Sequence, residues 1–257
     1  MNETWWGRFR RFVVTLAGLL FAWQLLVWIT GVPSFILPSP PIVMLTLVEE
    51  RWLILSHVWV TAFEIVMGLV LGVALGCLSA MGLASSMAAR RWLLPVLIAS
   101  QALPVFALAP ILVLWFGYGL GSKIAMAVLI IYFPVTAAFF DGLRRVEPGL
   151  RDLAQLAGAT RGQFLLWIAV PSALPALASG LRVAAAAAPI GAVVGEWVGA
   201  SQGLGFLMLH ANRRMQTDLT FAALLVLMVL ALLIYGAVDR LARRLTPWLN
   251  EQSIDPR

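Results

Sequence analysis

Residues 58–83 read VWVTAFEIVMGLVLGVALGCLSAMGL, and this stretch decides the fold class. Glu64 is its only charged side chain. An apolar run of about 18 or more residues with few charges is typical of a transmembrane helix, because ~20 residues rising ~1.5 Å each cross the ~30 Å hydrocarbon core. The stretch therefore predicts a membrane-spanning helix and places the chain among integral membrane proteins.

Working outward, five further apolar runs show the same pattern. They lie at about 12–30, 92–116, 123–143, 173–198 and 219–241. We therefore predict an all-α integral membrane protein with six transmembrane helices. The prolines after the first run predict a loop followed by a short amphipathic helix from Pro41, and we expect a glycine-containing loop at 199–217.

The expected organisation has three parts. Residues 1–57 hold the N-terminal transmembrane helix and a periplasmic segment. Residues 58–242 form a core of five transmembrane helices with a long loop at 144–171, and residues 243–257 form a cytoplasmic tail. Gly68, Gly72 and Gly76 recur every four positions on the second helix, which lets a neighbouring helix approach closely.

The composition excludes a soluble globular protein. Of 257 residues, 61% are hydrophobic and 12% are charged, whereas soluble domains have about 45–50% apolar and ~25% charged residues. The single cysteine, Cys77, cannot form an intrachain disulfide. The net charge of +6 does not indicate nucleic acid here, because the arginines cluster at the ends of the apolar runs, where they act as topology signals.

The distribution of basic residues predicts the orientation. With the N-terminus in the cytoplasm, the inner segments carry thirteen arginines: Arg8, Arg10, Arg11, Arg90, Arg91, Arg144, Arg145, Arg151, Arg161, Arg240, Arg243, Arg244 and Arg257. The outer segments carry four basic residues: Arg51, Lys123, Arg213 and Arg214. This bias follows the positive-inside rule, and an even number of helices places both termini in the cytoplasm. Arg182 lies within the fifth run, and the Arg213–Arg214 pair is a local exception.

The loop at 144–171 contains helix start and stop signals. Pro148 can occupy the first turn of a helix, and Gly158 is a natural helix terminator. Thr160 and Gln163 have the spacing of a capping box, which starts a second helix. We predict two short helices with a bend at residues 157–159, as either a docking element for a soluble partner or a plain structured loop.

Known catalytic patterns are absent from the sequence. Lys123, in Gly121-Ser122-Lys123, is the only lysine and lacks the phosphate-binding P-loop pattern, while His57 and His210 have no metal-ligand spacing around them. We expect no enzymatic activity, metal or cofactor on this chain. An ATP-independent secondary transporter stays an alternative, although no repeat symmetry supports it.

The same loop resembles the coupling motif of ABC-importer permeases, Glu-Ala-Ala-x3-Gly-x9-Ile-x-Leu-Pro. Here the matching residues are Asp152-Leu153-Ala154, Gly158, Ile168 and Val170-Pro171, with every spacing kept. The resemblance implies type-1 ABC importer permease architecture and a contact with an ATP-binding subunit. The residues implied in this coupling are Asp152, Ala154, Gly158, Ala159, Ile168 and Pro171.

Two further stretches, Leu37–Pro40 and Ala109–Gly119, resemble the nitrate, sulfonate and taurine branch of these permeases. The stretch from Ala188 to Gly199, continuing to Asp218, is most similar to permeases for hydroxymethylpyrimidine, the pyrimidine precursor of thiamine. The resemblance implies that precursor as solute, with sulfonate, taurine or nitrate as the alternative.

The family resemblance also implies an assembly in the bacterial inner membrane. Two copies of the chain would form a homodimer, two ABC ATP-binding subunits would bind ATP and magnesium, and a periplasmic or lipid-anchored binding protein would deliver the solute. No nucleic-acid partner is expected.

Polar residues within the apolar runs are candidates for the translocation pathway, because buried charges in membranes are costly and mark pathways or ion pairs. The candidates are Glu64, Ser100, Gln101, Pro104, Glu196 and Trp197. For Glu64 and Glu196 the alternative is pairing with basic or backbone groups, or reaching the lipid headgroups. For Trp197 it is interfacial anchoring.

Overall fold

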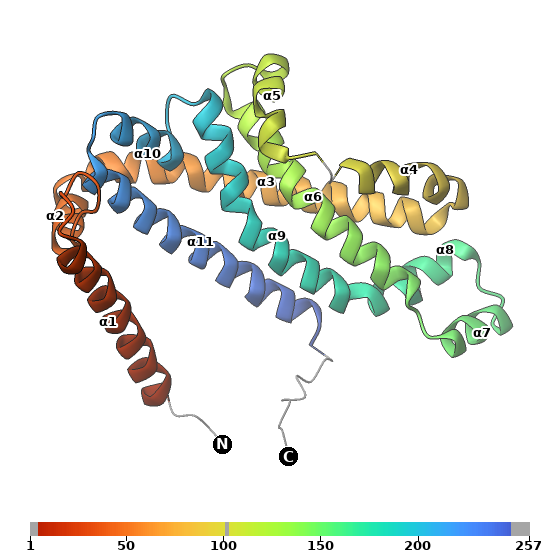
Figure 1. Cartoon of the computed structure of the whole chain (residues 1–257). Coiled ribbons are helices and arrows are strands. Elements are labelled where there is room, and N and C mark those ends of the chain that lie inside the picture. The colour runs from red at the N-terminus through yellow and green to blue at the C-terminus, as the bar shows by residue number, and fades with distance from the viewer. Residues whose placement is uncertain (1–4, 101–102, 248–257) are drawn as a thin grey trace.

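The computed structural model describes residues 5–100 and 103–247, and all regular structure in that part of the chain is helical (Figure 1). Long apolar helices form α1 (Trp5–Thr30), α3 (Arg51–Ser85), α6 (Leu120–Arg144), α9 (Val170–Gly199) and α11 (Thr217–Leu245). All five have the length and hydropathy of membrane spans, with α9 joined to the helical residues that precede it. These spans confirm the predicted fold class.

The predicted third span is divided. It consists of α4 (Met87–Ser100), the 3-10 helix η1 (Val105–Leu108) and α5 (Ala109–Phe116). The axis of α4 makes an angle of 92° with that of the segment formed by η1 and α5. Pro104 precedes η1 with an extended backbone, and Pro110 lies in the first turn of α5. A proline removes a helical hydrogen bond and disfavours helical geometry in the residue before it, so one straight helix over 92–116 does not form.

Two other boundaries differ from the prediction. The boundary expected between residues 57 and 58 falls inside α3, which already begins at Arg51 because Ile54 and His57 are buried. The loop expected at 199–217 contains α10 (Leu204–Arg213), in which Leu204, Leu207 and Ala211 are buried. Their spacing of three, four and seven residues is the helical signal that sequence reasoning missed.

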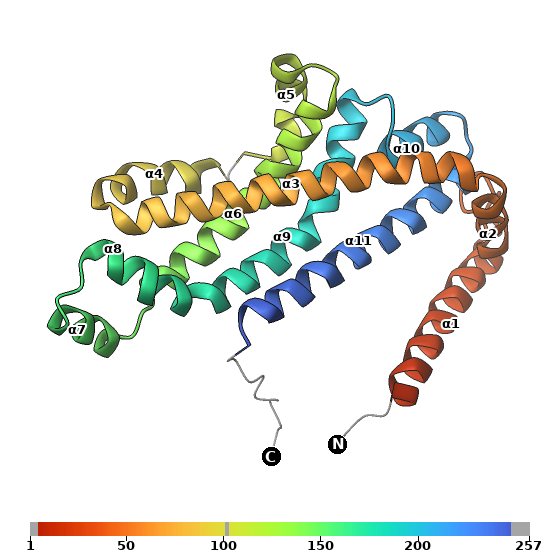
Figure 2. The same ribbon diagram turned by 180° about the vertical axis from the view of Figure 1, so that it is seen from behind.

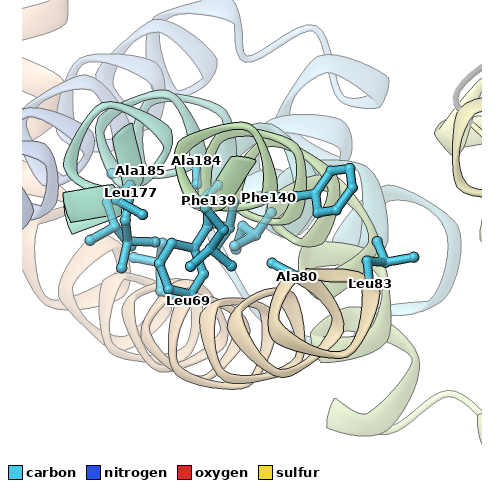
Figure 3. Packing of buried hydrophobic residues seen from close by; sticks show 14 of the residues in the cluster. Leu69, Ala80, Leu83, Phe139, Phe140, Leu177, Ala184 and Ala185 are labelled. Carbon is cyan, nitrogen blue, oxygen red and sulfur yellow. The ribbon is translucent and has the colours of Figure 1, made fainter. Parts of the chain in front are cut away.

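The centre of the molecule is the packing of α6 against α3 on one side and against α9 on the other. Figure 3 shows the side chains of the three helices meeting in one cluster, including Leu69, Phe139 and Leu177. Gly68 and Gly72 of α3 face α6: a Cβ added to Gly68 would lie 2.5 Å from the Cβ of Ala127, and one added to Gly72 would lie 2.7 Å from Ile131. Close helix approach at these glycines is confirmed.

The outer faces of the bundle are apolar and uncovered. None of the apolar span of α1 is buried, and α1 meets the rest near Trp23, whose ring centroid lies 5.6 Å from that of Phe221. Leu232 and Leu233 of α11 are also exposed. Such surfaces suit contact with lipid tails rather than water.

Short helices lie at both ends of the bundle. α7 (Pro148–Leu156) and α8 (Arg161–Phe164) project from one end, and α10 with α2 (Pro40–Glu49) lies at the other, as both views show (Figures 1 and 2). The short helix expected from Pro41 is therefore confirmed, with its start at Pro40.

We predict that Gly68→Ala destabilises the protein, whereas Gly82→Ala does not. The added methyl group at 68 collides with Ala127, but nothing lies within 4 Å of the corresponding position at Gly82 on the same helix. Overpacking of this kind costs about 1–3 kcal/mol. Thermal unfolding of the two purified variants in detergent measures the difference, and equal midpoints would show that α3 and α6 are not in close contact there.

Candidate functional site

The polar segment between α6 and α9 forms a bent element that we call the elbow, residues 148–164. Its first helix, α7, begins at Pro148 and ends at Leu156, and Gly158 follows with a φ of +72° that favours glycine. The N–H of Ala159 donates to the carbonyl of Ala154 (2.9 Å), and the N–H of Gly158 donates to that of Gln155 (3.0 Å). This pair of bonds is a Schellman motif, which satisfies the free carbonyls at the helix end.

The second helix of the elbow starts with the predicted capping box. The N–H of Gln163 donates to Thr160 Oγ1 (3.3 Å), and the N–H of Thr160 donates to Gln163 Oε1 (2.8 Å). Hydrogen-bonded ends on both sides of the glycine bend hold the elbow in one shape. The predicted pair of helices with a bend at 157–159 is therefore confirmed.

The elbow continues into α9 without a loop. A π-helical segment, Leu165–Ala169, joins α8 to α9, and Pro171 follows in the first turn of α9. Because proline has no N–H to donate, an irregular turn before it is physically reasonable. Ile168 packs against the central core in this junction and Pro171 is exposed beside it, so both belong to the joint between elbow and α9.

The elbow presents one face outward. Leu153 and Leu156 are 64% and 88% exposed, and Asp152 is exposed beside them. Ala154 is only 6% exposed. A helix rotates ~100° per residue, so Ala154 faces the core. The implied contact of Ala154 with an ATP-binding subunit stays a prediction, and Leu156 is the exposed residue that the motif did not indicate.

The opposite end of the bundle holds a buried polar cluster, which we call the outer cluster: His57, Thr61, Glu64, Lys123 and Glu196. The carboxylate of Glu196 accepts hydrogen bonds from the hydroxyl of Thr61 (2.6 Å) and from the backbone N–H of Gly205. Thr61 Oγ1 accepts from the N–H of Leu204 (2.8 Å). These side chains thus satisfy the free N–H groups of the first turn of α10.

The turn that enters α10 is also held by the outer cluster. His57 Nδ1 accepts from the N–H of Gly203 (2.9 Å). A Cβ added to Gly205 would lie 2.8 Å from Glu196 Oε2. The two glycines therefore let the backbone approach the carboxylate, and α10 is attached to both α3 and α9.

Glu64 and Lys123 form an ion pair inside the outer cluster. Lys123 Nζ lies 3.3 Å from Glu64 Oε1, and both side chains are buried, with 5% and 0% of their surfaces exposed. Lys123 was counted among the basic residues of the outer segments, and in the structure it is buried and faces Glu64 inside the chain. For Glu64 and Glu196, the alternative to a pathway role was pairing with other groups of the chain, and their contacts are of this kind. Glu196 is 1% exposed and also has its partners within the chain.

The other pathway candidates are not brought together with these acids. Ser100 is exposed and donates to the carbonyl of Leu97 (2.7 Å), and Pro104 precedes η1. Trp197 is half exposed next to Glu196. Gln101 lies outside the described residues. Arg182, unassigned from sequence, pairs with Asp239 of α11 (2.7 Å).

Among the described residues, no three His, Cys, Asp or Glu side chains come together as metal ligands. What the arrangement provides is mechanical: a stiff exposed elbow at one end, a capped helix at the other, and the continuous α9 between them. These features suit a membrane permease.

The chain belongs to the family described as the binding-protein-dependent transport system inner membrane component, whose model matches residues 72–247. It is 53% identical over 226 residues to a probable ABC transporter permease protein of Haemophilus influenzae, covering 88% of this chain and 92% of the relative. The predicted class, the permease subunit of an ABC importer, is thereby shown.

Relatives named for a solute are less similar. The formylaminopyrimidine transport permease ThiX of Halalkalibacterium halodurans is 39% identical, covering 91% of this chain and 94% of the relative. The riboflavin permease RibX of Chloroflexus aurantiacus is also 39% identical, covering 91% and 88%. Permeases named for aliphatic sulfonates in Bacillus subtilis and taurine in Escherichia coli are 30% identical, which supports the predicted branch.

Among solved structures, an inward-facing MetNI methionine ABC transporter matches with a TM-score of 0.68. The identity is 21%, and the match covers 77% of this chain and 98% of that one. This likeness supports the fold predicted from the sequence, the type-1 importer permease architecture.

We predict that Lys123→Met strongly destabilises the protein, because it leaves the Glu64 carboxylate buried without a counter-charge. Breaking one side of a buried ion pair costs about 3–5 kcal/mol. The double variant Glu64→Gln/Lys123→Met removes both charges and should recover most of that loss. Thermal unfolding in detergent checks both, and a single variant as stable as the wild type would contradict the buried pair.

Proposed function

We propose that this permease subunit carries a pyrimidine precursor of thiamine into the cell, and that its elbow docks on a separate ATP-binding subunit. The observation that carries the docking proposal is the outward face of the elbow, where Leu153 and Leu156 are exposed on a helix built into a polar, arginine-containing segment. The solute proposal rests on the relatives.

The exposed leucines are suited to a protein partner. Burying a leucine side chain contributes about 1.5–3 kcal/mol, so the two together supply a substantial part of a docking energy. Asp152 next to them offers a charge for a basic group on the partner. The Schellman motif and the capping box hold this face rigid before binding, so little ordering entropy is lost.

Movement of the elbow can reach the far end of the bundle through α9. This helix joins the elbow through the π-helical segment and ends beyond Glu196, which caps α10. When ATP closes the pair of ATP-binding subunits, a displaced elbow therefore tilts α9 and moves α10. The permease contributes two arrangements with different access, and the nucleotide shifts the balance between them.

The assembly that we propose has a homodimer of this chain in the inner membrane, with both termini and the elbow in the cytoplasm. Two ATP-binding subunits hold ATP and magnesium and perform the hydrolysis. A periplasmic or lipid-anchored binding protein delivers the solute to the end that carries α2 and α10. In both views the termini of the described chain lie away from that end (Figures 1 and 2).

The solute class follows from the relatives that carry a solute in their names. Formylaminopyrimidine and riboflavin share a pyrimidine ring, and both relatives are 39% identical to this chain. The taurine and sulfonate relatives are 30% identical. A pyrimidine is therefore favoured over an alkyl sulfonate, and within the pyrimidines we propose the small thiamine precursor.

The solute is tested by reconstituting the chain with the ATP-binding and solute-binding proteins that copurify with it from its host. We expect ATP-dependent uptake of hydroxymethylpyrimidine or formylaminopyrimidine into proteoliposomes, with riboflavin and taurine transported at least tenfold more slowly. Faster uptake of riboflavin or taurine would contradict the proposed solute but not the assignment of the chain as a permease.

We predict that Leu153→Gln/Leu156→Gln lowers ATP-dependent uptake at least tenfold while the fold is retained. Both side chains are exposed, so their replacement leaves the core intact, but it removes the apolar area available to the ATP-binding subunit. Glu147→Gln, at an exposed position that precedes the same helix and makes no side-chain capping bond, is the matched control. Copurification of the ATP-binding subunit and the uptake rate are measured together, and unchanged values in the double variant would overturn the docking face.

A further inference from the structure

A cavity of about 850 Å³ lies behind the elbow, between its two helices and the adjacent ends of α3, α4 and α6. Four arginines line it: Arg90 and Arg144 from the membrane core, and Arg151 and Arg161 from the elbow. No carboxylate is among the described residues that line the cavity.

Three of the four arginines lie over aromatic rings, and none of the three is paired with an acid in the described part of the chain. The guanidinium carbons of Arg90 and Arg144 lie 5.9 and 5.5 Å from the ring centroid of Phe140, and that of Arg151 lies 5.8 Å from the ring centroid of Phe164. These are cation–π distances. Within the part of the chain that the structure describes, none of the four arginines forms an ion pair with a carboxylate.

Four positive charges around one cavity repel each other, although Arg144, Arg151 and Arg161 are exposed and solvent screens part of the repulsion. An anion in the cavity would convert the repulsion into attraction. Guanidinium groups bind phosphate oxygens with two parallel hydrogen bonds, so phosphate is the anion that best suits this set of residues.

Other groups in the cavity suit a phosphate attached to an apolar body. Ser86 Oγ accepts a hydrogen bond from the N–H of Ala89 (3.2 Å). Its own hydroxyl group donates no hydrogen bond to a described residue, so it can donate to a ligand. Gln155 adds an amide donor, while Leu83, Leu143 and Leu165 supply apolar wall. The volume is within the ~300–1,000 Å³ of typical small-molecule sites.

We propose that this cavity is a binding site for a phosphate group carried on an apolar or aromatic body. Two sources share that chemistry: the headgroup of an anionic phospholipid at the membrane surface, and a soluble phosphate ester in the cytoplasm. Two arginines belong to the core and two to the elbow, so the bound phosphate joins the elbow to the membrane helices. Its effect on transport rests on the proposed function, but the binding itself does not.

The test uses the purified full chain in neutral maltoside detergent. Cys77, the single cysteine, is partly buried in α3 and reports unfolding through a thiol-reactive dye. Unfolding is followed with added phosphatidylglycerol, with phosphatidylcholine as the neutral lipid, and with phenyl phosphate as the soluble ester. The same titrations are made with Arg144→Gln and Arg90→Gln.

Adjacent arginines provide matched controls. Arg145 follows Arg144, and Arg91 follows Arg90, yet neither Arg145 nor Arg91 lines this cavity. We expect a phosphate compound to raise the unfolding temperature of the wild type, and Arg144→Gln or Arg90→Gln to weaken the apparent affinity about tenfold. Arg145→Gln and Arg91→Gln should retain the wild-type affinity, although they remove the same net charge.

The outcomes separate the two sources. A response to phosphatidylglycerol but not to phenyl phosphate assigns the site to lipid, and a response to phenyl phosphate assigns it to a soluble ester. Equal loss of affinity in the control variants would overturn the proposal, because binding would then depend on overall charge. No response to either phosphate compound would also overturn it, even if uptake assays support the permease function.

Discussion

The close approach of α3, α6 and α9 is the contact on which the rest of the structure depends. In lipid the helices gain little from burying apolar area against each other, so they associate through backbone proximity and tight packing. At Gly68 and Gly72 of α3, the α6 helix lies so close that an added methyl group would collide with it. Gly180 of α9 lies equally close to Ala138 of α6. Larger side chains at these positions would separate the helices and move apart the groups attached to their ends.

The central packing places a rigid helix between two specialised ends. α9 is held along its length by α6 and α11, including the Arg182–Asp239 ion pair. At one end it continues into the elbow, where every turn is closed by hydrogen bonds. At the other end the Glu196 carboxylate holds the first turn of α10. Under the proposed function, this connection carries the movement of the elbow to the far side of the membrane.

The polar groups of this chain serve different purposes according to their location. In the outer cluster, Glu64 and Glu196 find partners within the chain, so burial there stabilises one arrangement of α3, α9 and α10. Behind the elbow, Arg90 and Arg144 stack on Phe140 without a described acidic partner. The first set is paired within the chain, where Glu64 is held by its ion pair with Lys123 and not by a hydrogen bond to a described residue, and the second has charge left for a ligand.

The sequence by itself determined the membrane helices, the helix–bend–helix form of the elbow and the family, because these follow from runs of apolar residues and from capping signals within a few positions, such as Thr160 and Gln163. The tertiary structure alone decided which charges meet. The Glu64–Lys123 pair, the capping of α10 by Glu196 and the arginine-lined cavity each join residues far apart in the chain. Local periodicity did not predict the inward direction of Ala154 or the bend near Pro104. Both depend on how neighbouring helices pack, and no single stretch of sequence specifies that packing.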